Sequence, residues 1–152
     1  MKAFKLEPVL RYRNSIEDAL RRAALEKKER LNAETAALEA LTFRRRDHLR
    51  ELGEKLARGM NVSENFLYID YLVRMDDEMV VRKKAVDIAE EASEIARGRL
   101  IEGVRQRKIL ERLKEKHEEA HRRELLKQET GLFDEIAVNR FNHTRKADPY
   151  EG

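Results

Sequence analysis

Apolar side chains recur along most of this chain in alternating steps of three and four residues. In the first half the pattern runs through Leu20, Ala24, Leu31, Leu38 and Leu41. This spacing places the apolar side chains on one stripe of a helix, and a repeat of seven is typical of coiled coils. We call the positions that follow this spacing the seam.

The predicted seam of the first half also contains polar residues. Lys27, Glu34 and Arg45 fall on it, and such residues weaken a helix pair and fix its register. Two consecutive steps of four around Arg45 predict a stutter, which locally unwinds a supercoil. The full set is Leu20, Ala24, Lys27, Leu31, Glu34, Leu38, Leu41, Arg45, Leu49, Leu52 and Leu56.

The second half carries a matching pattern in which several seam residues are small. Ala89, Ser93, Ala96 and Gly103 allow two helices to approach closely or leave space for another chain. The predicted seam comprises Leu72, Met75, Met79, Arg82, Val86, Ala89, Ser93, Ala96, Leu100, Gly103, Arg107 and Leu110.

Breaks between helices are few. The two prolines, Pro8 and Pro149, lie near the ends, and proline costs a helix interior about 3 kcal/mol. Gly59 can end a helix, and Asn61 or Ser63 can cap the next. The chain is therefore predicted to be all-α, a single long antiparallel two-helix coiled coil (a helical hairpin) over residues 1–152. Its arms span about 9–58 and 64–128, with a turn at 59–63. Gly131 is predicted to break the second arm, leaving a C-terminal segment at 129–152.

Composition narrows the possible functions. Charged residues make up 41% of the chain, yet 33 basic and 30 acidic residues nearly cancel to a net charge of +3. Because the two signs alternate at helical spacing, solvated helix faces are favoured over nucleic-acid binding. The basic run at 44–46 is interpreted in the same way, with a contact to a phosphate or to an acidic partner as the alternative. There is no cysteine, no signal peptide is evident and no apolar run reaches the ~20 residues of a membrane span, so a cytoplasmic protein without direct membrane insertion is expected.

One motif resembles a zinc-protease helix. His117, Glu118, Glu119, Ala120 and His121 match H-E-x-x-H, in which two histidines on one helix face hold a metal ion. A hydrolase also needs a third ligand and a shaped cleft. Basic residues surround this motif, so we expect no catalytic residues, no metal site and no cofactor.

Large apolar residues cluster where the second arm begins. Phe66, Leu67, Tyr68, Ile69, Tyr71, Leu72 and Met75 occupy seven of ten consecutive positions. A two-helix seam buries only part of a helix's circumference, so some of these side chains should stay exposed. Exposed apolar patches mark interaction sites; the alternative is a hydrophobic plug at the tip of the hairpin.

Three segments resemble the FliJ family, the coiled-coil component of the bacterial flagellar export apparatus. The first, Phe4-Lys5-Leu6-Glu7-Pro8-Val9-Leu10-Arg11, resembles the family's opening F-x-L-E-x-V-L followed by arginines. The second, residues 108–116, resembles its K-x-L-E-R-L-x-E stretch, and the third, residues 128–137, resembles its terminal Q-K-E-L-D-E-x-A segment. Gly131 and Phe133 depart from that last pattern.

The resemblance implies a non-enzymatic stalk similar to the central stalk of rotary ATPases. Its partners would be the flagellar export ATPase hexamer, the cytoplasmic domain of the export gate and the export chaperones, at the inner face of the cell membrane. The joined chain ends would enter the ATPase ring through Leu6, Val9, Leu10, Arg11, Arg13, Leu132, Phe133, Ile136 and Phe141. The export-gate contact would lie at Leu41, Arg45, Leu49, Tyr68, Tyr71 and Met75.

Three other functions fit the same pattern. The chain could be the equivalent stalk of a virulence type III secretion system. It could also be a coiled-coil adaptor or chaperone in an unrelated pathway, or a basic helical arm that binds RNA, for which a steep salt dependence of affinity would be diagnostic.

Overall fold

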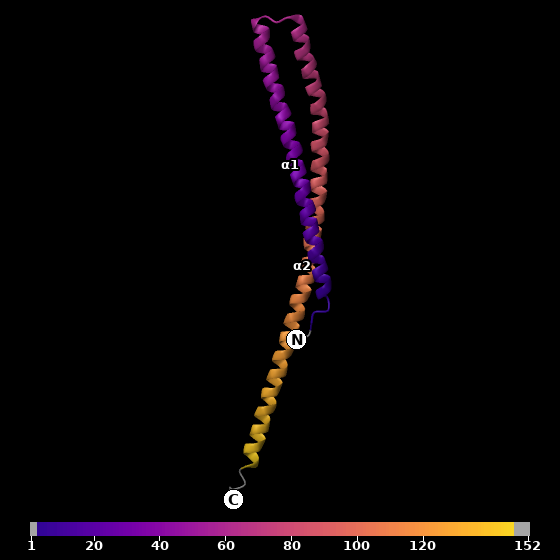
Figure 1. Ribbon diagram of the computed structural model, residues 1–152. Coiled ribbons are helices and arrows are strands. Elements are labelled where there is room, and N and C mark those ends of the chain that lie inside the picture. Colours follow the sequence, from indigo (N-terminus) through magenta and orange to yellow (C-terminus); the bar gives the residue numbers. More distant parts are fainter. Residues whose placement is uncertain (1–2, 148–152) are drawn as a thin grey trace. The chain divides into compact units, whose positions relative to one another are not determined.

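Two long helices form the structure, a computed structural model in which residues 3–147 are described. Helix α1 spans Glu7–Arg58 and helix α2 spans Val62–Lys146 (Figure 1). The described residues contain no strand. The predicted all-α hairpin is confirmed. By their contacts the residues divide into two compact units, one of residues 15–104 and one of residues 1–14 with 105–152.

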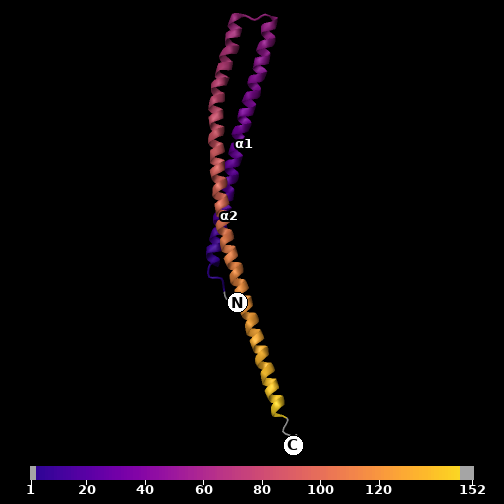
Figure 2. The ribbon, with the colours of Figure 1, turned by 180° about the vertical axis from the view of Figure 1, so that it is seen from behind.

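The turn between the helices follows the chemistry of three residues. Gly59 has φ of 89°, the left-handed conformation that ends a helix. The side chain of Asn61 accepts a hydrogen bond from the backbone N–H of Ser63 at 3.2 Å, which caps α2. From this turn α1 and α2 run side by side through the 15–104 unit, and the reverse view shows the same pairing (Figures 1 and 2).

Burial within the 15–104 unit follows the heptad closely. On α2 the seam positions from Asn65 to Gly103 follow one another in steps of three or four residues, with Met75, Ala89 and Ala96 buried and with Asp70, Ala85 and Ala92 half-buried beside them. The predicted seam of the second half is confirmed over this range. On α1, Leu41 and Leu52 are buried, while Lys27 is exposed although its spacing places it on the seam.

The stutter predicted around Arg45 is wrong. The half-buried residue after Arg45 is His48, three positions on, and Leu49 is 41% exposed. The seam therefore continues through Leu41, Arg45, His48 and Leu52 in regular steps of four, three and four. The imidazole ring of His48 therefore takes the seam position that the prediction assigned to Leu49.

The break predicted at Gly131 is also wrong, since α2 continues to Lys146 rather than ending near 128. A glycine in a helix interior costs only about 1 kcal/mol relative to alanine. Leu125 to Glu129 before it and Leu132 to Ala137 after it are mostly good helix formers. The hydroxyl of Thr130 donates to the Leu126 carbonyl at 2.8 Å, so this residue also fits the helix. The residues of the predicted tail from 148 onward lie outside the described part of the chain.

Candidate interaction surfaces

The tip of the 15–104 unit is built around His48. Its ring stacks on Tyr68 with centroids 4.8 Å apart and meets the edge of Tyr71 at 4.6 Å. The Nε2–H of His48 donates to the Tyr68 carbonyl oxygen at 3.2 Å. Aromatic pairs of this kind contribute about 0.5–1.5 kcal/mol beyond their burial. His48 therefore fixes the position of both tyrosines relative to α1.

Polar residues of α1 complete the environment of Tyr68. Its hydroxyl donates to Glu51 at 3.1 Å, and the ammonium of Lys55 lies 4.9 Å from the ring centroid. Hydrogen bonding with Tyr68 raises the pKa of Lys55 above its ordinary value. Tyr68 is thus contacted by His48, Glu51 and Lys55 of α1, and Tyr71, which is 42% exposed, is the more accessible of the two tyrosines.

The six predicted gate residues divide into two groups. Leu41 and Met75 are only 4% and 2% exposed, so they belong to the core and are closed to a partner. Arg45 is partly exposed and pairs with Asp76 across the two helices, Nε to Oδ1 at 2.5 Å. Leu49 and Tyr71 are exposed. Of the six residues, Arg45, Leu49 and Tyr71 therefore remain accessible, and Tyr68 is half-buried.

Further apolar side chains near the start of α2 are also exposed. Val62, Phe66, Leu67 and Val73 are each more than half exposed. Apolar residues were expected to remain exposed in this cluster, and the structure places them on the solvent side of α2. The sequence did not predict that His48, Glu51 and Lys55 contact the tyrosines. His48 could have been identified, because it follows Arg45 by three residues, as the seam spacing requires.

In the unit of residues 1–14 and 105–152, the start of α1 packs on α2. The carboxylate of Glu7 lies 2.9 Å from the ammonium of Lys114, and this hydrogen bond raises the pKa of Lys114. Leu10 is buried. The ring of Phe4 packs against His117, with centroids 5.7 Å apart. The first turns of α1 are therefore held against the stretch of α2 around 114–117.

The H-E-x-x-H histidines have a packing role. His117 and His121 are both half-buried, and they continue the seam of α2, whose positions recur every three or four residues from Asn65 onward. Among the described residues, no group of three His, Cys, Asp or Glu side chains could hold a metal ion.

The last 26 described residues of the chain, 122–147, are all exposed. Leu125, Leu132 and Ile136 lie on one side of the helix, with Leu126 and Phe133 beside them, each about half or more exposed. Exposed apolar side chains of this kind make the segment a candidate binding surface. We call residues 122–147 the free end.

The predicted ring-contact residues are not brought together. The start of α1 contacts α2 near His117, and Leu132 lies 15 positions further along the same helix, about 22 Å at 1.5 Å per residue. Leu6 and Val9 are partly exposed, Arg11 is exposed, Arg13 is half-buried and Leu10 is buried. The expected joining of the two ends is thus absent among the described residues. Leu132, Phe133 and Ile136 lie close together on the free end, whereas Phe141, nine positions after Leu132, lies on the opposite side of the helix.

No described helix is both long enough and apolar enough to cross a membrane. Two long helices packed as a hairpin define the chain as an all-α coiled-coil protein. The family model described as flagellar FliJ protein matches residues 1–146. The chain therefore belongs to the FliJ family, a family of non-catalytic stalk proteins associated with type III export.

A solved structure shows the same fold. The YscO homolog CT670 from Chlamydia trachomatis superposes with a TM-score of 0.62 at 20% identity, covering 96% of this chain and 99% of that one. None of the curated proteins matches the chain.

Proposed function

We propose that the protein is the central stalk of a flagellar export ATPase, with the free end as the part that enters the ring. The observation that carries this proposal is the match to the FliJ family over residues 1–146. The apolar side of the free end supports it, because that side has no cover within the described chain. A ring of ATPase subunits would provide that cover.

The chemistry of the free end suits such a contact. Leu132, Phe133 and Ile136 form an apolar anchor, and Arg140 lies one helical turn beyond Ile136. Interfaces favour an apolar centre with arginine near its rim. The chain itself would hydrolyse nothing, since it has no glycine-rich phosphate loop; its role is mechanical coupling between the ring and the gate.

The second contact we propose lies at the hairpin tip, where Arg45, Leu49 and Tyr71 would bind the cytoplasmic domain of the export gate. The same apolar tip is also available to empty export chaperones. The protein would thus work at the cytoplasmic face of the membrane through the export apparatus, in support of motility and chemotaxis. An equivalent stalk in a virulence type III system is the second candidate, favoured by the fold shared with a YscO homolog.

Charged substitutions in the free end test the stalk. Leu132→Asp with Ile136→Asp should abolish stimulation of the export ATPase and co-purification with it. Val138→Asp is the matched control, because Val138 is also exposed but lies on the other side of the same helix. All three side chains are exposed, so helix content measured by circular dichroism should be retained. Full stimulation by the double variant would contradict the stalk assignment.

The gate contact has a separate test. Leu49→Ser with Tyr71→Ser should weaken binding to the gate domain and leave ATPase stimulation intact, because the tip and the free end are distinct surfaces. Loss of the ATPase response in this variant would show that the tip only stabilises the fold.

Genetic complementation in a flagellated host, scored by swimming, distinguishes a flagellar stalk from a virulence one.

A further inference from the structure

Helix α2 carries a second apolar stripe beside its seam in the 15–104 unit. Val81, Ala85, Ile88, Ala92 and Ile95 follow one another in steps of four, three, four and three, the spacing of a coiled-coil seam. Val81, Ile88 and Ile95 are 65%, 69% and 49% exposed. These positions of a two-helix coil ordinarily carry polar side chains. We call these five residues the outer stripe.

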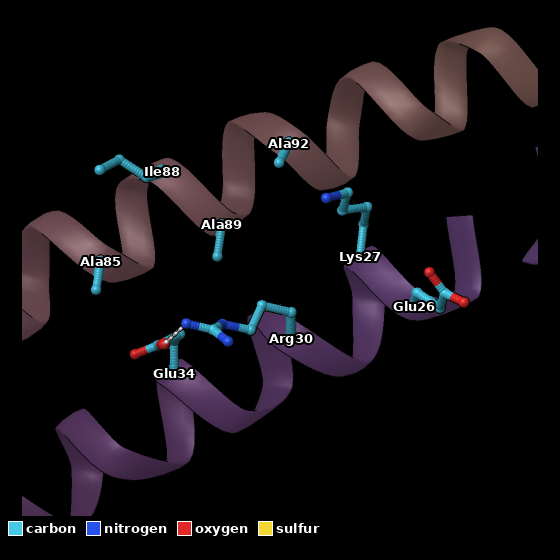
Figure 3. Close-up of a pocket in the computed structure, with 8 residues that line it drawn as sticks. All are labelled: Glu26, Lys27, Arg30, Glu34, Ala85, Ile88, Ala89 and Ala92. Carbon is cyan, nitrogen blue, oxygen red and sulfur yellow. Dashed lines mark ion pairs between the residues drawn. The ribbon is translucent and has the colours of Figure 1, made fainter. Parts of the chain in front are cut away.

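The outer stripe borders an open groove between the two helices. The groove has a volume of 530 Å³ and is lined by Glu26, Lys27, Arg30, Glu34, Ala85, Ile88, Ala89 and Ala92. The alanines of α2 project toward α1, while Ile88 points away from it (Figure 3). On the α1 side, Arg30 pairs with Glu34 at 3.0 Å. The small α2 residues leave room beside them for apolar side chains from outside.

We propose that this face binds the same face of a second copy, with the two α2 helices antiparallel. The stripe alternates small and large residues. A two-fold axis between Ala85 and Ile88 places Ala85 of one copy opposite Ile88 of the other, and Val81 opposite Ala92. Each layer then combines one small and one large side chain, which is how helix surfaces interlock. A parallel pair would place Ile88 on Ile88 and Ala85 on Ala85.

Charge supports the same arrangement. Lys84 and Glu91 lie along one edge of the outer stripe, both exposed and without an ion-pair partner within the described chain. The axis that sets Ala85 against Ile88 brings Lys84 of each copy to Glu91 of the other. The contact is therefore isologous and closes as a dimer. It ends where Ile95 meets Glu78 of the second copy, so it covers about five helical turns.

A contact of this length belongs to the weak class of interfaces. The dimer should be observed as a reversible, concentration-dependent species in sedimentation velocity of the full chain. Ile88→Ser should weaken it by about a hundredfold, because two isoleucines leave the interface at once. The fold should survive this change, since Ile88 is outside the seam.

Charge reversal gives the sharpest test. Lys84→Glu alone places like charges together twice and should weaken the dimer about tenfold. Adding Glu91→Lys should restore it, because both pairs are then reversed. Lys83→Glu with and without Glu90→Lys is the matched control: these residues are also exposed and seven apart, but lie on the side of α2 away from the stripe. Equal effects from both sets would overturn the proposal.

The chain has no cysteine, so single cysteines report the arrangement directly. A mixture of Val81→Cys and Ala92→Cys proteins should form the mixed disulfide. Val81→Cys alone should not cross-link, because the two copies of residue 81 would be about 16 Å apart along the helices, beyond the ~7 Å limit for a disulfide. Cross-linking by Val81→Cys alone, or a monomer at every concentration, would overturn the proposal.

Discussion

Leu20 and Gly103 mark a close approach of α1 and α2: the Cδ1 atom of Leu20 lies 2.7 Å from where a Cβ on Gly103 would stand. Real Cβ atoms do not tolerate such a contact, so the leucine must move if residue 103 gains a side chain. Both residues occupy seam positions. The lack of a side chain at residue 103 therefore makes room for the Leu20 side chain, and no special backbone conformation is involved.

This contact predicts opposite outcomes for two glycines in the same helix. Gly98→Ala should stabilise the fold by about 0.5–1 kcal/mol, because alanine is the better helix former and no atom lies within 4 Å of the added carbon. Gly103→Ala should give no such gain or destabilise, since Leu20 must leave its position. Urea unfolding followed by circular dichroism measures both. Equal stabilisation by the two substitutions would show that the close approach does not exist in solution.

His48 and Leu49 allow a direct test of the register of α1. His48→Ala should destabilise by about 1–3 kcal/mol, through loss of its aromatic contacts and its hydrogen bond to Tyr68. Leu49→Ala should cost well under 1 kcal/mol because its side chain is exposed. The same unfolding measurements apply. If Leu49→Ala were the more destabilising, the seam would run through Leu49, as a stutter requires.

The ion pair between Arg45 and Asp76 should be measurable by a double-mutant cycle. Arg45→Ala, Asp76→Ala and the double variant should give a coupling of about 0.5–1 kcal/mol, at the upper end for exposed pairs because Arg45 reaches both carboxylate oxygens, at 2.5 and 3.5 Å. Repeating the cycle in 1 M salt should reduce the coupling. A coupling near zero in low salt would mean that the pair does not help to fix the register.

The ion pair of Glu7 with Lys114 predicts a pH dependence at the start of α1. Its hydrogen bond raises the pKa of Lys114 above 10.5. A lysine whose pKa is higher in the folded state stabilises that state fully below 10.5, and the contribution is lost as pH rises through the raised value. An NMR titration of the Lys114 side chain should give a midpoint above 10.5, and Glu7→Gln should lower it. An unchanged midpoint in this variant would exclude the contact.

Much of the fold could be predicted because helical spacing is local information. The turn at Gly59 and the α2 seam through Met75 and Gly103 required only periodicity and breakers. His48 was missed because its burial depends on Tyr68 and Tyr71, which are distant in sequence. Gly131 was misinterpreted because one glycine cannot outweigh good helix formers on both sides. Leu41 and Met75 were assigned to a partner although they lie on the seam, and a buried seam residue is not available for binding.

The free end should be the least protected part of the helices. Residues 122–147 have no packing partner among the described residues, and isolated helices of this length are only marginally stable in water. Their amides should exchange with deuterium much faster than those of residues 72–100, where α2 is packed on α1. Gly131→Ala should slow exchange in the free end alone, because it removes about 1 kcal/mol of helix cost and meets no atom within 4 Å. Protection of 122–147 equal to that of 72–100 in the isolated monomer would show that this segment is already covered, and the export ATPase would then have no free surface to bind there.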